Sequence, residues 1–231
     1  MQYTITGGTM PVLHINLDRD ESIVAESGEF TWMSDHIAMR TSTQAAGGGG
    51  LFGALVRVVS GGTLFMTEYI AQGAPGEVAF AARIPGTIEA VDLDGQHALM
   101  VHRHGFVCAT REVQLTMGFQ QKLGAGLLGG DGLILQKLQG RGKAFIELGG
   151  ASVMRTLAAG ETIRAHPNHV GMFDASVNFS ITTISGIKNA FFAGDGIFQA
   201  RLTGPGRIWL QSMTVPRMAH ALAPYLVGNK N

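Results

Sequence analysis

The stretch that decides the fold is FFAGDGIFQARLTGPGRIWL at residues 191–210, because it occurs more than once in the chain. Residues 127–146 read LLGGDGLILQKLQGRGKAFI, so that Asp131 corresponds to Asp195 and Gly142 to Gly206, 64 positions apart without a gap. A looser third copy, SGGTLFMTEYIAQGAPGEVAFA, occupies residues 60–81. Each copy reads as a glycine-rich loop, a strand, a tight turn containing two glycines and a return strand, which predicts a β-hairpin.

A second motif recurs with the first. The segments ESIVAESGEF, HALMVHRHGF and ETIRAHPNHVGMF begin at Glu21, His97 and Glu161, and the last two starts are again 64 positions apart. Each repeat therefore contains two predicted hairpins. We expect one globular unit, residues 1–231, made of three fused repeats at residues 1–86, 87–150 and 151–231.

The remaining pattern predicts an all-β fold with a few short helices. Runs of four to seven apolar or β-branched residues are bounded by Gly, Asp or Pro, which is typical of many short strands rather than βαβ units. We expect each repeat to be a β-sandwich or a short β-helical roll. Its inner face would hold Phe198, Ala200 and Leu202, and its outer face is expected to hold Arg201, Lys137, Trp209 and Phe145.

The end of the third repeat predicts a helix. Thr214 is a suitable N-cap and Pro216 fits the first turn, while Met218, Leu222 and Tyr225 fall on one helical stripe. Pro224 limits the regularity of this helix.

Composition excludes several classes of function. The 231 residues include 17 basic and 17 acidic ones, and only 15% are charged, which predicts a surface partly shared with other subunits. The neutral charge argues against binding to nucleic acid. The single Cys108 excludes an internal disulfide, fits the cytoplasm and reads as a buried, inert thiol. We see no secretory signal, and residues 51–59, interrupted by Arg57, are too short to span a membrane.

Strong catalytic motifs are missing from the sequence. It contains no G-x-x-x-x-G-K-[ST], CxxC, HExxH or G-x-S-x-G pattern. Residues 124–129 match G-x-G-x-x-G but precede a predicted hairpin rather than a helix, so no dinucleotide or other cofactor is expected. Asp131 and Asp195 are interpreted as residues that bond to their own turn backbones, with paired catalytic carboxylates as the alternative.

Three side chains suggest a metal site. Alignment of the repeats places Glu26, His102 and His166 at equivalent positions, each a few residues before a turn glycine. Two histidines and one carboxylate form a known ligand set for divalent iron. If the repeats surrounded a common axis, these side chains could converge. The alternative is that they are solvated turn residues at a strand end.

Apolar pairs recur beside glycine in each repeat. They are Leu51 and Phe52, Leu127 and Leu128, and Phe191 and Phe192. One hypothesis is that Leu51 and Phe52 bind a membrane surface or a protein partner; the alternative is that the pairs fill the repeat core or a subunit interface.

With these motifs in view, the chain resembles the altered-inheritance-of-mitochondria family. The resemblance rests on GEFTWMS at residues 28–34, the glycine run before Leu51, and the SGGTLFM, GGDGL and GDGIF motifs, and it covers essentially the whole chain. It implies a fold like the trp RNA-binding attenuation protein, with three β-sandwich repeats related to a shortened double-stranded β-helix. It also implies a symmetric homo-oligomer, with a trimer favoured, but no established activity and no catalytic residues.

Two functions are therefore compared. The first is a self-assembling structural or binding protein without catalytic activity. The second is a metal-dependent enzyme that uses Glu26, His102 and His166.

Overall fold

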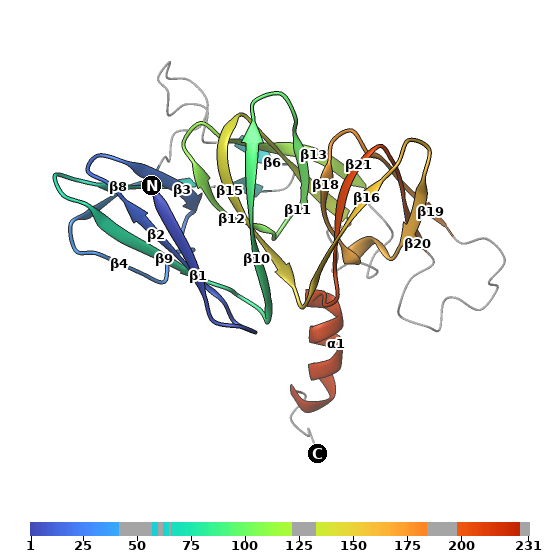
Figure 1. Cartoon of the computed structure of the whole chain (residues 1–231). Coiled ribbons are helices and arrows are strands. Elements are labelled where there is room, and N and C mark those ends of the chain that lie inside the picture. Colours follow the sequence, from blue (N-terminus) through green and yellow to red (C-terminus); the bar gives the residue numbers. More distant parts are fainter. Residues whose placement is uncertain (42–56, 60–61, 65, 122–132, 184–197, 227–231) are drawn as a thin grey trace.

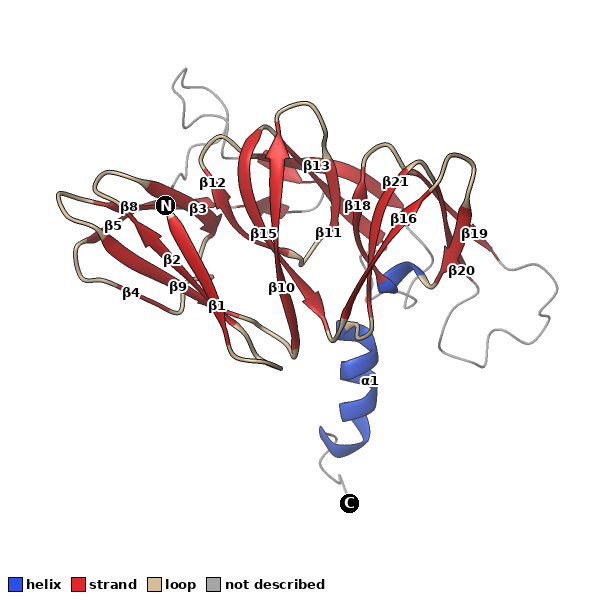
Figure 2. Cartoon of the chain, viewed as in Figure 1, coloured by secondary structure: helices blue, strands red, loops and turns tan. Residues whose placement is uncertain are grey.

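Alternating apolar residues form strands along most of this chain, and the strands assemble into antiparallel sheets. The computed structural model describes residues 1–41, 57–59, 62–64, 66–121, 133–183 and 198–226. Within these ranges the protein is all-β with one C-terminal α-helix, as predicted (Figures 1 and 2).

The strands have the following bounds. The N-terminal third of the chain contains β1 (Gln2–Thr6), β2 (Val12–Leu17), β3 (Ser22–Glu26), β4 (Trp32–Met33), β5 (Ile37–Thr41), β6 (Arg57–Val59), β7 (Gly62–Leu64), β8 (Met66–Ala71) and β9 (Gly76–Ala81). The middle contains β10 (Gly86–Asp94), β11 (Leu99–His102), β12 (Phe106–Thr110), β13 (Gln114–Gln121), β14 (Leu133–Gln139) and β15 (Arg141–Gly149). The C-terminal third contains β16 (Ser152–Leu157), β17 (Thr162–Ala165), β18 (Val170–Asp174), β19 (Asn178–Thr183), β20 (Phe198–Thr203) and β21 (Gly206–Gln211).

One pairing scheme occurs three times. β2, β10 and β16 pair with β9, β15 and β21, and these in turn pair with β4, β12 and β18. Likewise β3, β11 and β17 pair with β8, β14 and β20, which pair with β5, β13 and β19. We call the three sets of six strands the first, second and third strand groups. Each group supplies two three-stranded sheets.

Neighbouring groups share sheets. β3 of the first group pairs with β12 of the second, and β11 of the second pairs with β18 of the third. These two pairings create two six-stranded sheets, β10-β15-β12-β3-β8-β5 and β13-β14-β11-β18-β21-β16. The end sheets are β1-β2-β9-β4 and β17-β20-β19. Figure 1 shows the groups following one another from the N-terminal to the C-terminal side.

The four large sheets stack as layers with three hydrophobic cores between them. The first core contains Leu13, Ile15 and Phe80 from one end sheet and Phe145 from the six-stranded sheet beside it. The second core lies between the two six-stranded sheets, and the third lies against β17-β20-β19. Each inner sheet therefore has a hydrophobic core on both faces, although β16 at the edge of one of them is exposed.

The predicted hairpins are wrong in their pairing. β8 and β9 lie in different sheets, as do β14 and β15, and β20 and β21; the same holds for the second motif, where β11 and β12 are separated. Each motif is an arch that carries the chain from one layer to the facing layer. Glycine allows the sharp bend: Gly140, between β14 and β15, has a φ of 116°, and Gly73, between β8 and β9, has a φ of 75°.

The predicted outer face is only partly correct. Ala200 and Leu202 are fully buried and Arg201 is exposed, as expected. Phe145 and Trp209, however, are 0% and 7% exposed rather than on the surface. Alternation alone predicts one solvated face, but where Phe145 and Trp209 lie the six-stranded sheets have a hydrophobic core on each side.

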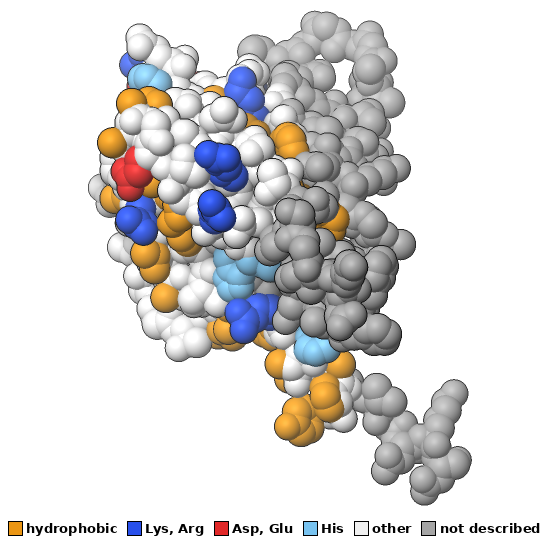
Figure 3. Space-filling view, turned by 90° about the vertical axis from the view of Figure 1, so that its right-hand side faces the viewer, with side chains coloured by type: hydrophobic (Ala, Val, Ile, Leu, Met, Phe, Trp, Pro, Cys, Tyr) orange, Lys and Arg blue, Asp and Glu red, His pale blue; other side chains and the backbone are white. Residues whose placement is uncertain are grey.

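The predicted C-terminal helix is confirmed. α1 (Val215–Leu226) follows Thr214, whose Oγ1 accepts a hydrogen bond from the Arg217 N–H at 3.3 Å. The helix projects from the body of the molecule, and hydrophobic side chains are visible along it below the cationic face at the β19–β20 end (Figure 3). Among the described residues no helix is long and apolar enough to cross a membrane.

The arch glycines yield a stability prediction. A Cβ on Gly140 would lie 2.3 Å from the Glu112 carbonyl oxygen, whereas a Cβ on Gly28, which also has a positive φ, would meet no atom within 4 Å. We expect Gly28→Ala to lower the free energy of unfolding by about 1 kcal/mol and Gly140→Ala by about 3 kcal/mol or more. Urea denaturation of both variants measures the difference, and equal losses would contradict the tight arch.

Candidate functional site

The three residues predicted to bind metal occupy one position of the pairing scheme. Glu26 and His102 end β3 and β11, and His166 directly follows β17. The groups follow one another in a row rather than around an axis. Glu26 ends the strand that pairs with β12 and His102 ends the strand that pairs with β18, whereas β17, before His166, pairs with β20 alone among the described strands. Among the residues that the structure describes, no three His, Cys, Asp or Glu side chains form a group that could hold a metal ion.

The His102 side chain is held by a hydrogen bond to the backbone. Its Nε2 donates a hydrogen bond to the Glu147 carbonyl oxygen at 3.1 Å. Burial lowers the pKa of His102 from 6.5 to about 4, against the opposing effect of that hydrogen bond. The imidazole is therefore neutral at pH 7.

Glu26 and His166 lie in different surroundings. Burial raises the pKa of Glu26, while the charge of Arg83 opposes this increase. His166 lies instead beside His169, with ring centroids 5.8 Å apart. Sequence equivalence thus identifies matching positions, but it does not bring the three side chains together.

The junction between the first and second groups is closed by Glu147. Its carboxylate is 4% exposed and accepts hydrogen bonds from the N–H groups of Arg83 and Ile84 at 2.8 and 3.1 Å. The Arg83 guanidinium donates to the same carboxylate at 2.9 Å, and it also bonds to the His104 carbonyl and forms an ion pair with Glu29. A buried charge is thereby paired and hydrogen-bonded.

Gln211 closes the next junction in the same way. Its Oε1 accepts a hydrogen bond from the Gly149 N–H at 2.9 Å, and its Nε2 donates to the Asn168 carbonyl at 2.8 Å. Glu147 and Gln211 are 64 residues apart, like the recurring motifs. Sequence reasoning missed both residues, although their shared position at the end of the recurring motif was a usable signal.

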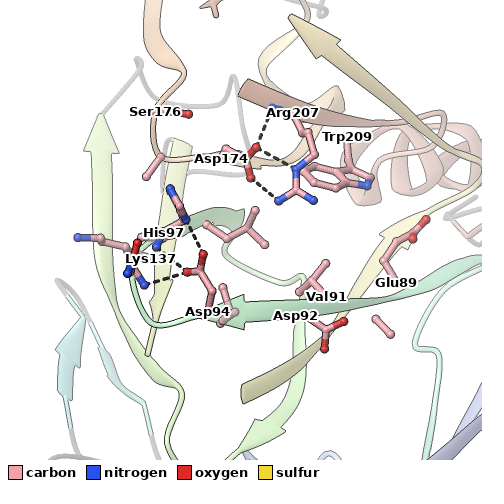
Figure 4. Close-up of a pocket in the computed structure, with 16 residues that line it drawn as sticks. Glu89, Val91, Asp92, Asp94, His97, Lys137, Asp174, Ser176, Arg207 and Trp209 are labelled. Atoms are coloured by element: carbon pink, nitrogen blue, oxygen red, sulfur yellow. Dashed lines mark hydrogen bonds and ion pairs between the residues drawn. The ribbon is translucent and has the colours of Figure 1, made fainter. Parts of the chain in front are cut away.

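A groove lined by described residues lies between β10 and the third strand group. It has a volume of about 830 Å³ and is bordered by Glu89, Val91 and Asp92 on β10 and by Trp209 on β21 (Figure 4). An aromatic floor beside a strand edge suits recognition of an extended chain.

The charged side chains of the groove are partly neutralised within it. Asp174 accepts hydrogen bonds from the Nε and Nη2 of Arg207 at 3.0 and 2.9 Å, and the Arg207 guanidinium lies 5.1 Å from the Trp209 ring centroid. The bonds to Asp174 raise the pKa of Arg207. Asp94 accepts from the Gln96 and His97 N–H groups and from the His97 ring, which hold the pKa of its carboxyl well below the usual range.

Other predicted features lie outside the described residues. These are the G-x-G-x-x-G match at residues 124–129, Asp131, Asp195 and the apolar pairs including Leu51 and Phe52. Cys108 is described and is fully buried, as expected, and burial raises the pKa of its thiol.

Comparison with known proteins identifies the family. The family model described as mitochondrial biogenesis AIM24 matches residues 3–213, which is nearly the whole chain. The chain belongs to the AIM24 family. The resemblance expected from the sequence is therefore confirmed.

Relatives of this AIM24 chain are uncharacterised. A protein of Streptococcus pyogenes serotype M6 is 26% identical over 236 residues, which cover 100% of this chain and 93% of that protein. A crystal structure of a Streptococcus pyogenes protein matches with a TM-score of 0.75 and 22% identity, covering 97% of the AIM24 chain and 99% of the other. At this identity the structural match concerns the fold alone.

The Glu147 junction can be tested by substitution. Glu147→Ala leaves two backbone N–H groups and the Arg83 guanidinium without their acceptor, so we expect a loss of about 3–5 kcal/mol in the free energy of unfolding. Glu147→Gln retains an acceptor, as Gln211 does, and should cost about 1–2 kcal/mol. Guanidinium denaturation measures both, with the exposed Glu112→Ala as a control expected to change by less than about 0.5 kcal/mol.

The lowered pKa of His102 predicts that the stability of the folded protein depends on pH. Its pKa in the folded protein, about 4, lies below the value of 6.5 for an unperturbed histidine. The unfolded chain therefore binds more protons between these values, and stability is lost as pH falls from about 6.5 towards 4. We expect His102 to account for about 2–3 kcal/mol of this loss.

Denaturation of wild type and His102→Gln at pH 7.5 and 4.5 measures that contribution. The pH difference should shrink in His102→Gln and persist in the control His220→Gln, which alters an exposed helix residue. An unchanged difference in His102→Gln would overturn this assignment.

Proposed function

We propose that this AIM24 chain is a self-assembling structural or binding protein whose three strand groups are repeats of one unit. In this proposal, copies associate head to tail through the same strand pairing that joins the repeats within a chain. The observation that carries the proposal is that two internal junctions use one pairing rule, while the strands that would form a third junction have open edges.

The open edges are complementary in the scheme. Internally, β3 pairs with β12 and β11 pairs with β18. Continuing the rule, β17 of one copy would pair with β4 of the next. Among the described strands β4 pairs with β9 and β17 pairs with β20, each on one side alone. Unpaired strand edges present N–H and C=O groups that template the addition of another strand.

The internal junctions also supply a register. Ala25 lies opposite Cys108 in the first junction, and Val101 lies opposite Met172 in the second. The matching positions at the chain ends are Ala165 on β17 and Trp32 on β4, so these two residues are proposed to face each other between copies. The exposed fraction of Trp32, 44%, is high for its size, and pairing would cover it.

A closed homotrimer is the proposed assembly. A head-to-tail interface forms a ring when its rotation closes and an open filament when it does not. The family resemblance implies a symmetric homo-oligomer with a trimer favoured, and closure of the ring would leave no β4 or β17 edge unpaired. The low content of charged residues, 15%, agrees with a surface partly buried between copies.

The assembly has a direct test. Light scattering during gel filtration should give three times the chain mass of 24.4 kDa. In the double variant Trp32→Cys and Ala165→Cys, oxidation should produce disulfide-linked trimers on a non-reducing gel. Residues directly opposite in antiparallel strands have Cα atoms about 4.5–5.5 Å apart, within the range of a disulfide.

Two controls define the register. The pair Trp32→Cys and Ile163→Cys is displaced by two residues along β17 and should cross-link poorly. Each single cysteine variant should assemble normally but form no disulfide-linked trimer. A mass equal to one chain, or equal cross-linking by the displaced pair, would contradict the proposal. Cys108 is buried and does not compete.

A further inference from the structure

Strand β1 seals the junction between the first and second strand groups. It pairs with the outer edge of β2, where Tyr3 lies opposite Ile15 and Ile5 lies opposite Leu13. The Tyr3 ring meets the Phe145 ring edge-on, with centroids 4.9 Å apart. Leu13 and Ile15, which lie opposite these residues on β2, are both 0% exposed.

The next junction has the same framework without such a strand. β10 holds the place of β2, because both pair with the last strand of their group: Leu17 lies opposite Gly76 and Leu93 lies opposite Gly142. Among the described residues β10 pairs with β15 alone, so the edge that corresponds to the β1 side of β2 is open. The 830 Å³ groove lies along this edge.

The aromatic residue that borders the groove, Trp209, corresponds to Phe145, on which Tyr3 packs at the first junction. Trp209 follows Phe145 by 64 residues, and each aromatic residue is preceded two positions earlier by a basic one, Arg207 or Lys143. Lys143 lies over the Tyr3 ring at 5.3 Å from its centroid. Trp209 and Arg207 therefore occupy the places that contact β1 at the first junction, but here they border the groove (Figure 4).

The strand edge in the groove differs from β2 in one chemical respect. By the register, Val91 occupies the place of Ile15, and Glu89 occupies the place of the fully buried Leu13. Both Val91 and Glu89 are half-buried. Of the four carboxylates that border the groove, Asp174 pairs with Arg207, Asp94 with His97 and Asp92 with Lys143, whereas Glu89 makes no ion pair with another described residue. The half-buried Glu89 carboxylate therefore favours a cationic side chain on the occupant.

We propose that this groove binds an extended, basic peptide that adds as a strand to the open edge of β10. An aromatic side chain of the peptide lies opposite Val91 and packs on Trp209, as Tyr3 does on Phe145. Two residues further along, a lysine or arginine lies opposite Glu89 and pairs with its carboxylate. Backbone hydrogen bonds to β10 supply affinity, and the aromatic-x-basic spacing supplies specificity.

The test uses a peptide derived from residues 1–7, with threonine in the place of Met1 and lysine in the place of Ile5. Acetyl-Thr-Gln-Tyr-Thr-Lys-Thr-Gly-amide is titrated into the full-length protein by calorimetry, beside the same peptide with glutamate for lysine. We expect the lysine peptide to bind about tenfold more tightly, because a partly buried carboxylate favours the cation. Hydrogen exchange should show new protection in β10 when the lysine peptide is bound.

Substitutions of Glu89 separate this site from general charge attraction. Glu89→Lys should reverse the preference, and Glu89→Gln, which keeps the shape of the side chain, should abolish it. The control Glu112→Lys makes the same change of charge on the surface outside the groove and should leave the preference intact. Failure of the lysine peptide to bind at millimolar concentration, or an unchanged preference in Glu89→Gln, would overturn the proposal.

Discussion

Backbone pairing between strands of neighbouring groups is the interaction on which the rest of the structure depends. β3 with β12, and β11 with β18, turn separate three-stranded sheets into two continuous six-stranded ones. Because each of these sheets is covered on both faces, the three hydrophobic cores are stacked and share their walls. A group cannot be displaced without opening a sheet and uncovering a core, so the groups stabilise one another.

Polar side chains fix the geometry where this pairing ends. Glu147 and Gln211 hold the backbone that leads from one group into the next, one through a carboxylate and the other through an amide. The corresponding place in the first group is Ala81, which matches Glu147 because Gly76 and Gly142 lie opposite Leu17 and Leu93 in the two pairings.

The strand groups differ in the side chains at equivalent positions, and these differences give each junction its own surface. The first junction is closed by β1 and the aromatic contact of Tyr3 with Phe145, whereas the second leaves Trp209 bordering a groove. The change from Leu13 to Glu89 places a carboxylate where the first junction needs an apolar side chain. One framework thus provides a sealed contact at the first junction and an open groove at the second.

The sequence by itself determined the strand content, the AIM24 resemblance, the burial of Ala200 and Leu202, and the C-terminal helix, because alternation, glycine spacing and capping are local properties. It did not determine which strands pair. A glycine turn between two strands serves a hairpin or an arch equally well, and only the facing layers decide between them. For the same reason, alternation wrongly placed Phe145 and Trp209 on an outer face. The alignment of recurring motifs likewise suggested that Glu26, His102 and His166 converge. Equivalent positions in a row of strand groups stay one group apart, and that arrangement is set by the tertiary structure.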